Sequence, residues 1–382
     1  MPMNNRAPFA PENGRFTALD LFRGMTICLM IIVNTPGNEE TSFGFLKHAD
    51  WDGFTLADLV FPSFLFAMGN ALSFSSKRWA SQTTSEVMLK IGKRTLLIFL
   101  VGYLMYWFPF FSLDDNAHLI LSPFAHTRIM GVLQRIALCY GITAILVYYL
   151  NKDRILIIGI ASLIFYWAIL VWFGEPGQEY SKTGNAVLSI DSFLFGTNHL
   201  YHGEGFPFDP EGLLSTLPAL FNVICGYLVG NFIQTKGLTK KMLTQLIIVG
   251  IGMSIIAYDW DLFFPINKKL WTSPYAVLTV GLDCLLLTAI IYCTDFRKMK
   301  RGTEFFLAFG KNPLTIYVLS EIGVTLMWLI PVGDTPLYSL IYDHIFAHAG
   351  TYIGSLLFAL WWMLMCWVVA YILDRKKIYI KL

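Results

Sequence analysis

Hydrophobic residues along this chain gather in ten long stretches that short polar segments separate. Each stretch approaches the ~20 residues that an α-helix needs to cross a bilayer, and none alternates as transmembrane β-strands do. The stretches lie near residues 17–34, 55–75, 91–111, 130–150, 155–173, 212–233, 242–258, 271–293, 304–329 and 351–373. The pattern therefore predicts an all-α fold, a polytopic membrane protein built as a bundle of about ten transmembrane helices.

A single domain accounts for the whole chain, because no internal repeat or low-complexity tract interrupts residues 1–382. Residues 1–16 are polar and have no apolar core before a cleavage site, so we expect a cytoplasmic tail and no cleaved signal peptide. Residues 174–210 form the longest connection, which we expect to be an outer loop. Loops of this length are usually functional or disordered.

The positions of lysine and arginine set the expected orientation, because cytoplasmic loops of membrane proteins are enriched in them. With the N-terminus in the cytoplasm, the outer loops hold only Lys47, Arg128, Lys182, Lys268 and Lys269. The inner loops and the C-terminal tail then hold Lys77, Arg78, Lys152, Arg154, Lys236, Lys240, Lys241, Arg297, Lys298, Lys300, Arg301, Arg375, Lys376, Lys377 and Lys381. This bias predicts that both termini are cytoplasmic.

Composition supports the membrane class and removes other classes. Hydrophobic residues make up 55% of the chain and charged residues 14%, against roughly 25% charge in a typical soluble domain. The 28 basic and 26 acidic residues nearly balance, so we expect no nucleic-acid partner. All six cysteines fall inside predicted spans, where a thiol behaves as a small hydrophobe.

Polar side chains within the spans are the first candidates for function, because they are costly at membrane depth. They include Asp20, Arg23, Asn34, Asp58, Arg94, Arg135, Asp283, Lys311, Asn312 and Glu321. Each can be a paired structural charge or part of a substrate path, and the sequence leaves both open. Arg23, Arg94 and Arg135 are predicted near the inner halves of their helices, where three guanidinium groups can bind a phosphate-bearing anion.

The first outer loop holds the densest candidate site, residues 47–53 (KHADWDG). Asp50 and Asp52 follow His48 closely, and a histidine oriented by an aspartate can act as a general base. An inert loop histidine is the alternative. His344 and His348 are four residues apart, but no third ligand lies near them, so we expect no metal site.

Eight ordered stretches resemble one known family. They are residues 19–24 (LDLFRG), 33–34 (VN), 47–62 (KHADWDGFTLADLVFP), 131–135 (GVLQR), 199–201 (HLY), 208–212 (FDPEG), 265–271 (PINKKLW) and 375–379 (RKKIY). In this set the chain is similar to the heparan-alpha-glucosaminide N-acetyltransferase family of lysosomal transmembrane acetyltransferases and their bacterial relatives. The resemblance implies a transmembrane acyltransferase domain that moves acetyl from cytosolic acetyl-CoA to the amine of a terminal glucosamine on the far side.

The resemblance places one residue, His48, in a role, and the polar residues around it suggest the other roles. The family's catalytic histidine corresponds to His48, and we expect Asn34 and Asp58 to act beside it, with Asn34 or Asn312 donating to the thioester oxyanion. The acetyl-CoA site is expected to use Asp20, Arg23, Arg94, Arg135 and Asn312. The acceptor site is expected to use Trp51, Asp52, Tyr201, Asp209, Glu211, Trp271 and Glu321, with the tryptophans and Tyr201 stacking on the sugar and Asp209 or Glu211 attracting its ammonium group.

Several alternatives stay open. The lysosomal enzyme has a luminal domain and one span that this sequence lacks, so a smaller amino sugar at a bacterial inner membrane is an alternative acceptor to heparan sulfate. We favour a ternary complex over an acetyl-histidine intermediate. An amino-sugar or N-acetylglucosamine transporter is the runner-up, and a structural or signalling membrane protein is a third reading. The expected partners are acetyl-CoA, an amino sugar and lipid, and a homodimer is left open.

Overall fold

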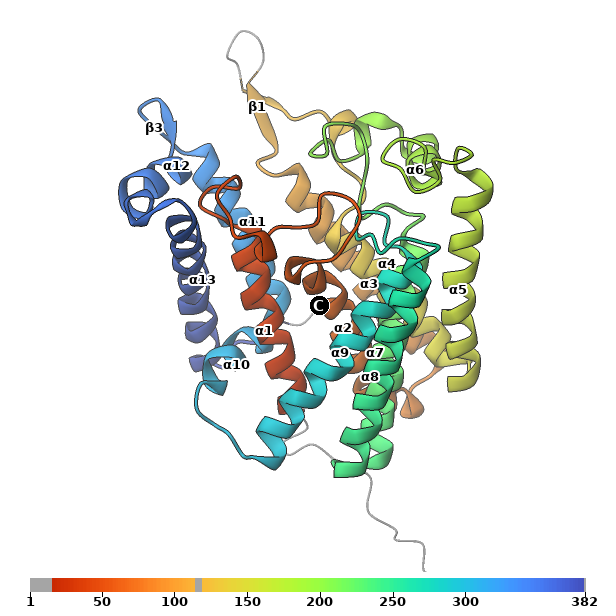
Figure 1. The fold of residues 1–382 in the computed structure, drawn as a ribbon. Helices are drawn as coiled ribbons and strands as arrows, with labels where there is room; N and C mark the ends of the chain where they lie inside the picture. Colours follow the sequence, from red (N-terminus) through yellow and green to blue (C-terminus); the bar gives the residue numbers. More distant parts are fainter. Residues whose placement is uncertain (1–15, 114–118, 381–382) are drawn as a thin grey trace, which may run out of the picture.

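The computed structural model describes residues 16–113 and 119–380, and most of them belong to helices that run side by side (Figure 1). The helices are α1 (Thr17–Asn34), α2 (Leu56–Ser75), α3 (Thr84–Trp107), α4 (Val132–Tyr149), α5 (Lys152–Phe173), α6 (Ala186–Phe195), α7 (Thr216–Lys236), α8 (Lys240–Asp261), α9 (Ser273–Ile291), α10 (Thr303–Lys311), α11 (Pro313–Leu329), α12 (Leu337–Ile341) and α13 (Thr351–Arg375). Two antiparallel hairpins pair β1 (Phe111–Leu113) with β2 (Leu119–Leu121) and β3 (Pro331–Val332) with β4 (Thr335–Pro336). The predicted cytoplasmic tail lies almost wholly outside the described residues.

The prediction of an all-α polytopic membrane protein is confirmed. Within the described ranges, eight helices are long and apolar enough to cross a membrane, namely α1, α2, α4, α5, α7, α8, α9 and α13. The other two predicted spans correspond to α3, whose first half carries four charged residues, and to the region of α10 and α11. The count of ten therefore stays a prediction.

The predicted span 304–329 is not one helix. α10 ends at Lys311, and α11 begins at Pro313. Proline has no amide hydrogen to donate to the preceding turn, and its ring clashes with that turn. Asn312 between them has φ −132° and ψ 48°, outside the helical region, so the chain breaks there.

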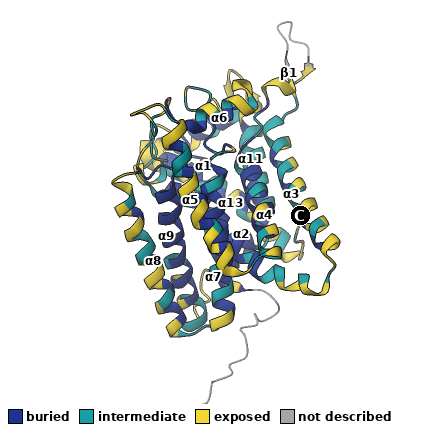
Figure 2. Cartoon of the chain, turned by 90° about the vertical axis from the view of Figure 1, so that its right-hand side faces the viewer, coloured by how far each residue is buried: buried dark blue, intermediate teal, exposed yellow. Residues whose placement is uncertain are grey.

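The centre of the bundle is the contact between α2 and α7. A Cβ at Gly69 would lie 1.9 Å from the carbonyl oxygen of Val223, and one at Gly226 would lie 2.0 Å from that of Phe66. Glycine at both positions therefore lets the two backbones touch. Figure 2 shows α2, α7 and α9 as the buried interior, whereas α5 and α8 are largely exposed. The exposed residues of α5 and α8 are mostly isoleucine, valine and aromatic residues, as contact with lipid requires.

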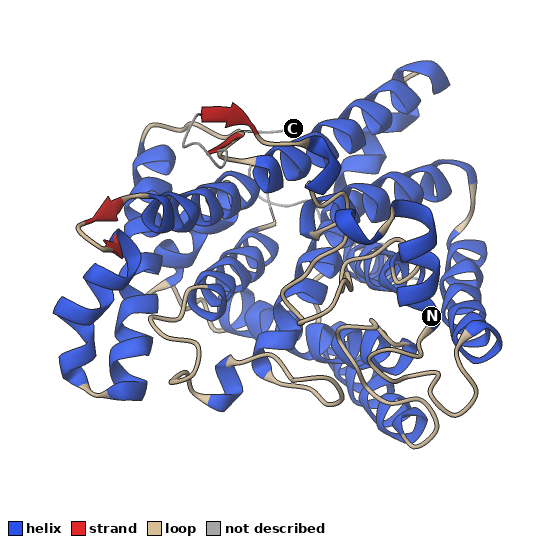
Figure 3. Cartoon of the chain, turned by 90° about the horizontal axis from the view of Figure 1, so that it is seen from above, coloured by secondary structure: helices blue, strands red, loops and turns tan. Residues whose placement is uncertain are grey.

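The two ends of the bundle differ. We call one the loop-rich end; it carries segments 35–55, 108–113, 119–131, 174–215, 262–272 and 330–350, including both hairpins (Figure 1). Figure 3 looks onto this end and shows loops lying across the helix ends. The opposite end has mostly short connections between antiparallel helices. The predicted outer loops thus share one end, while the orientation of that end relative to the cytoplasm stays a prediction.

Candidate active site

The N-terminus of α2 fixes a carboxylate beneath the first loop. Thr55 and Asp58 form a capping box, in which the Asp58 Oδ2 atom accepts hydrogen bonds from the Thr55 amide at 2.9 Å and the Thr55 hydroxyl at 3.1 Å. The Ala49 amide also donates to Oδ2, at 3.2 Å. Such a box satisfies amides that a helix start leaves unpaired, and here it leaves Oδ1 free for another partner.

That partner is His48. Its Nδ1 atom lies 2.8 Å from Asp58 Oδ1, and a carboxylate can only accept, so Nδ1 carries the hydrogen. The other ring nitrogen, Nε2, therefore carries a lone pair. The Asp58 side chain is fully buried, whereas 38% of the His48 side chain is accessible. The dyad thus holds a basic nitrogen, oriented by a buried carboxylate, on a partly accessible side chain.

Lys268, from the loop between α8 and α9, completes this group. Its Nζ atom lies 3.0 Å from His48 Nδ1 and 3.1 Å from Nε2, and 3.9 Å from Asp58 Oδ1. Burial lowers the pKa of the His48 imidazole, and the Lys268 ammonium lowers it further, while Asp58 and Glu211 only partly oppose the shift. The imidazole is therefore held in its neutral, basic form.

A second polar cluster surrounds Arg128 at the same end. The guanidinium donates from Nε to Asp209 Oδ2 at 2.9 Å, and from Nη2 to Asp209 Oδ1 and Glu211 Oε2, both at 2.6 Å. It also lies between the rings of Tyr106 and Tyr201, 4.8 and 4.7 Å from their centroids. Asp209 is 1% exposed and both its oxygens accept from Arg128, so its role in attracting the acceptor's ammonium group stays a prediction.

The environments of Arg135 and Trp271 correct two further predictions. Arg135 lies in the first turn of α4, fully buried, and donates to Ser215 and to the Gly212 carbonyl at the loop-rich end. It is therefore not near the inner half of the bundle, because α4 begins at the loop-rich end. Trp271 is fully buried, with the guanidinium of Arg135 4.8 Å from its ring, so no sugar can stack on it.

The amide predicted to help His48 lies at the end of α1. Asn34 is exposed, and its Nδ2 atom donates one hydrogen bond, of 3.2 Å, to Glu321 Oε1 in α11. A side-chain amide has two such hydrogens, so the second is available to a ligand. Glu321 therefore orients Asn34, and nothing in the geometry places Glu321 itself against the acceptor.

The remaining predicted acceptor residues tie the loops together. The Trp51 indole donates to the Tyr180 carbonyl at 2.7 Å, and Asp52 Oδ1 accepts from the Asn267 amide at 3.1 Å. Tyr201 is 38% exposed although one of its faces covers Arg128. Asp52 and Tyr201 are exposed, whereas Trp51 is partly buried.

The opposite end of the bundle holds the other predicted donor residues. Asp20 and Arg23 pair, as their spacing on α1 predicts, and Arg94 stacks on Tyr140 with its Cζ atom 4.6 Å from the ring centroid. The Nε atoms of Arg23 and Arg94 are buried without a hydrogen-bond partner. Each arginine thus keeps a donor for an anion, although no described contact joins the two.

Asn312 also lies at this opposite end. Its Nδ2 atom donates to the Ile378 carbonyl at 2.9 Å, and its Oδ1 atom accepts from the Ile380 amide at 3.0 Å. Neighbouring Lys311 pairs with Asp374 at 2.8 Å, which is a local role. Asn312 therefore holds the C-terminal segment, and the prediction that it donates to an oxyanion beside His48 is wrong.

Sequence reasoning missed Lys268 and Arg128 as site residues. Both were counted only as outer-loop charges, and the contacts that distinguish them join residues 220 and 81 positions apart. The only signal for Lys268 was its place in the family-like segment 265–271. For metals, no three histidine, cysteine or acidic side chains converge in residues 16–113 and 119–380.

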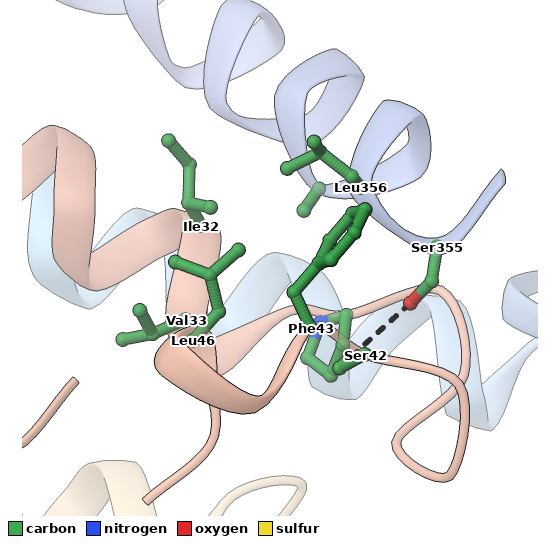
Figure 4. A pocket seen from close by; sticks show the side chains of 9 residues that line it. Ile32, Val33, Ser42, Phe43, Leu46, Ser355 and Leu356 are labelled. Atoms are coloured by element: carbon green, nitrogen blue, oxygen red, sulfur yellow. Dashed lines mark hydrogen bonds between the residues drawn. The ribbon is translucent and has the colours of Figure 1, made fainter. Parts of the chain in front are cut away.

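One small pocket lies beside the site and is apolar. Ile32, Val33, Leu46 and Leu356 line it between α1, the first loop and α13. Figure 4 shows Phe43 reaching into it and the hydrogen bond between Ser42 and Ser355, of 3.3 Å, at its rim. It contains none of the predicted site residues, so the polar chemistry lies elsewhere at this end.

Comparison with known proteins gives consistent matches. The profile of the family "Heparan-alpha-glucosaminide N-acetyltransferase, catalytic" matches residues 15–246, which include both His48 and Asp58. The mouse heparan-alpha-glucosaminide N-acetyltransferase is 29% identical over 379 residues, covering 83% of this chain and 55% of that protein. The human protein of the same name is 26% identical over 428 residues, covering 96% of this chain and 60% of that protein. The chain thus spans little more than half the length of these relatives, and it belongs to the heparan-alpha-glucosaminide N-acetyltransferase catalytic family.

Proposed function

We propose that this protein is a transmembrane N-acetyltransferase that moves acetyl from cytosolic acetyl-CoA to the amine of a terminal glucosamine or related amino sugar. The observation that carries the proposal is the His48–Asp58 pair, in which a buried carboxylate orients a partly accessible imidazole in a member of this family. The proposed location is a bacterial inner membrane, with both termini cytoplasmic and the loop-rich end outside.

His48 supplies the base in this proposal. An amine attacks a thioester only when it is unprotonated, and a neutral imidazole can take its proton. Asp58 then stabilises the imidazolium that forms, in the way a buried carboxylate supports other catalytic histidines. Burial and Lys268 lower the pKa of His48. The imidazole therefore stays unprotonated, and can act as a base, at pH values below those at which an ordinary histidine loses its proton.

Asn34 is proposed to stabilise the thioester oxygen as it gains negative charge. Its second amide hydrogen is free, while the bond to Glu321 holds the amide in place. A fixed donor aimed at a developing oxyanion is typically worth a factor of 10²–10³ in rate. Asn34 and His48 both border the first loop, which places the two contributions at one end of the bundle.

The donor is proposed to extend along α1. Asp20 and Asn34 are 14 residues apart on this helix, and the rise of 1.5 Å per residue makes that roughly 21 Å. The phosphates of CoA would then meet Arg23 and Arg94 at the opposite end, and the thioester would reach Asn34. The partnerless Nε atoms of both arginines support this placement.

The acceptor is proposed to enter at the loop-rich end. Tyr201 offers a partly exposed ring to a sugar face, and Glu211 offers negative charge to its ammonium group. Burial raises the pKa of the Glu211 carboxyl, but Arg128, Arg135 and Lys268 lower it more, so Glu211 stays ionised near neutral pH. A glucose-type sugar lacks the amine and should not react.

The test uses purified protein in nanodiscs with labelled acetyl-CoA and glucosamine, followed for labelled N-acetylglucosamine. Turnover with glucosamine and none with glucose would support the proposal. Exposed His344 provides a matched control, because its hydrogen bond goes to the Leu340 carbonyl of its own helical segment. His344→Gln should keep turnover, and a folded parent protein without turnover would refute the activity.

The same assay separates the two mechanisms. In a ternary complex, acetyl passes directly to the amine and His48 only moves a proton. In the alternative, His48 is acetylated first and shows ping-pong kinetics. Hydroxylamine-labile label on His48 after incubation without sugar would overturn the ternary route.

A further inference from the structure

Two loops from distant parts of the sequence are joined at His48, and this junction places Lys268. The Gly53 amide donates to the Ile266 carbonyl at 2.8 Å, and the fully buried Asn267 bonds both Asp52 and the Leu270 amide. Lys268 follows directly, so its side chain is directed by backbone that is already tied to the first loop. The hydrogen bonds between the two loops therefore fix the contact between Lys268 and His48.

The surroundings of Lys268 combine burial with incomplete charge compensation. Only 15% of the side chain is accessible, and Asp58 is the acidic group in contact, at 3.9 Å. Burial lowers the pKa of the Lys268 ammonium, with Lys269 adding to the shift, while Asp58, Glu211 and Glu204 oppose it. The net shift is downward, which increases the fraction of neutral amine.

The position of Nζ is also the position that an acceptor must reach. A general base removes a proton across about 2.6–3.2 Å, and Lys268 Nζ lies 3.1 Å from the lone-pair nitrogen of His48. The lysine and a glucosamine acceptor carry the same reactive group, a primary amine. Both cannot occupy this place together, so an acceptor must displace the lysine.

We propose that the Lys268 amine occupies the acceptor's amine position in the free protein and is acetylated there by acetyl-CoA when no acceptor is bound. This inference rests on the proposed function, since it uses the same donor and the same histidine. It makes Lys268 a self-modification site and an internal competitor of the sugar.

The step balances without another reactant. The ammonium first loses a proton to solvent. The neutral Nζ then attacks the thioester carbonyl, a C–N bond forms, and His48 Nε2 takes the second proton. The C–S bond breaks, the sulfur leaves with the electron pair, and His48 returns its proton to the thiolate. The products are an acetamide on Lys268, free CoA and one proton released to solvent.

Two neighbouring lysines serve as internal controls. Lys269 is next in sequence, but its amine pairs with Glu204. Lys47 precedes His48, but its amine donates to the Glu40 carbonyl at 2.9 Å. Neither contacts a ring nitrogen of His48, so geometry predicts that neither is acetylated with Lys268.

The experiment incubates the full-length protein in nanodiscs with isotopically heavy acetyl-CoA and no sugar. Hydroxylamine then removes any acetyl-imidazole, and mass spectrometry measures heavy acetyl at Lys268, Lys269 and Lys47. We expect heavy acetyl at Lys268 well above both controls, and suppression by saturating glucosamine. His48→Gln should slow the labelling of Lys268 by on the order of 10²-fold, as loss of a general base does.

The suppression by glucosamine needs no variant, so the inference stays testable even if His48→Gln fails to fold. Equal labelling of the three lysines, or labelling of Lys268 that glucosamine leaves unchanged, overturns the inference. Turnover of glucosamine without label on Lys268 overturns the inference and leaves the proposed function standing. Label on Lys268 without turnover of any amino sugar supports the inference and overturns the proposed acceptor.

Discussion

The two polar clusters at the loop-rich end use the same kinds of side chain but differ in how completely their partners are supplied. Arg128 has two carboxylates and two aromatic faces around it, and only 14% of its side chain is accessible. His48 has one carboxylate, one ammonium and a side chain that is 38% accessible. Glu211 links the clusters, because it bonds Arg128 and also acts on His48 and Lys268.

The difference separates a stabilising charge from a reactive one. A buried charge whose partners are complete gains nothing by exchanging them, and removing one partner leaves an uncompensated charge. A group with a free lone pair and an accessible edge can bind a substrate and move a proton. We therefore expect changes at Arg128 to alter stability and changes at His48 to alter turnover.

The largest expected effect is at His48. His48→Gln should lower turnover of acetyl-CoA and glucosamine by about 10²–10⁴-fold, because it removes the base. Thermal unfolding in nanodiscs should change little, since the side chain is partly accessible. A folded His48→Gln protein with parental turnover would show that His48 has a structural role and not a catalytic one.

Arg128 should show the opposite pattern. Arg128→Gln leaves Asp209 and Glu211 without their cation, and breaking a buried pair in this way typically costs about 3–5 kcal/mol of unfolding free energy. The measurement is denaturant or thermal unfolding, with turnover expressed per folded molecule. Exposed Arg154 is the matched control, and Arg154→Gln should stay within about 0.5 kcal/mol. Equal stability of both variants would contradict the assignment of Arg128 as a structural charge.

Arg23, at the opposite end, is a third kind of site. It pairs with Asp20, and its Nε atom has no hydrogen-bond partner. If it holds a CoA phosphate, Arg23→Gln should weaken CoA binding by about 1.5–3 kcal/mol, which is roughly ten- to hundredfold. Binding can be measured by calorimetry, with exposed Arg78→Gln as control. If a folded Arg23→Gln protein binds CoA as tightly as the parent, Arg23 serves only to pair with Asp20 within α1.

The smallest effect is a displacement of the pH profile. Lys268 lowers the pKa of His48, so Lys268→Met should raise that pKa. The base is active above its pKa, so activity is lost as pH falls through it. The acid limb of kcat/KM, which reports the free enzyme, should therefore move to higher pH in Lys268→Met. Lys269→Met should leave the acid limb in place. An unmoved limb in Lys268→Met would show that Lys268 does not determine the pKa of the catalytic base.

Part of this molecule follows from local sequence. The apolar stretches determine the all-α membrane class, because burying apolar helices in lipid depends on the composition of each segment alone. The spacing of Asp20 and Arg23 predicts their pairing within one helix, which the structure bears out. His48 and Asp58 were both singled out from the sequence, since the histidine lies among loop carboxylates and the aspartate opens a helix.

Only the tertiary structure decided the rest. It placed Arg135 at the loop-rich end, buried Trp271 beneath it, and used Asn312 to hold the C-terminal segment. It also brought Lys268 to His48, across 220 residues. The pattern of apolar and polar residues within one segment predicts whether that segment forms a helix. Which helices and loops meet depends on packing between segments far apart in the chain, and that packing decides which charges are satisfied and which stay free to react.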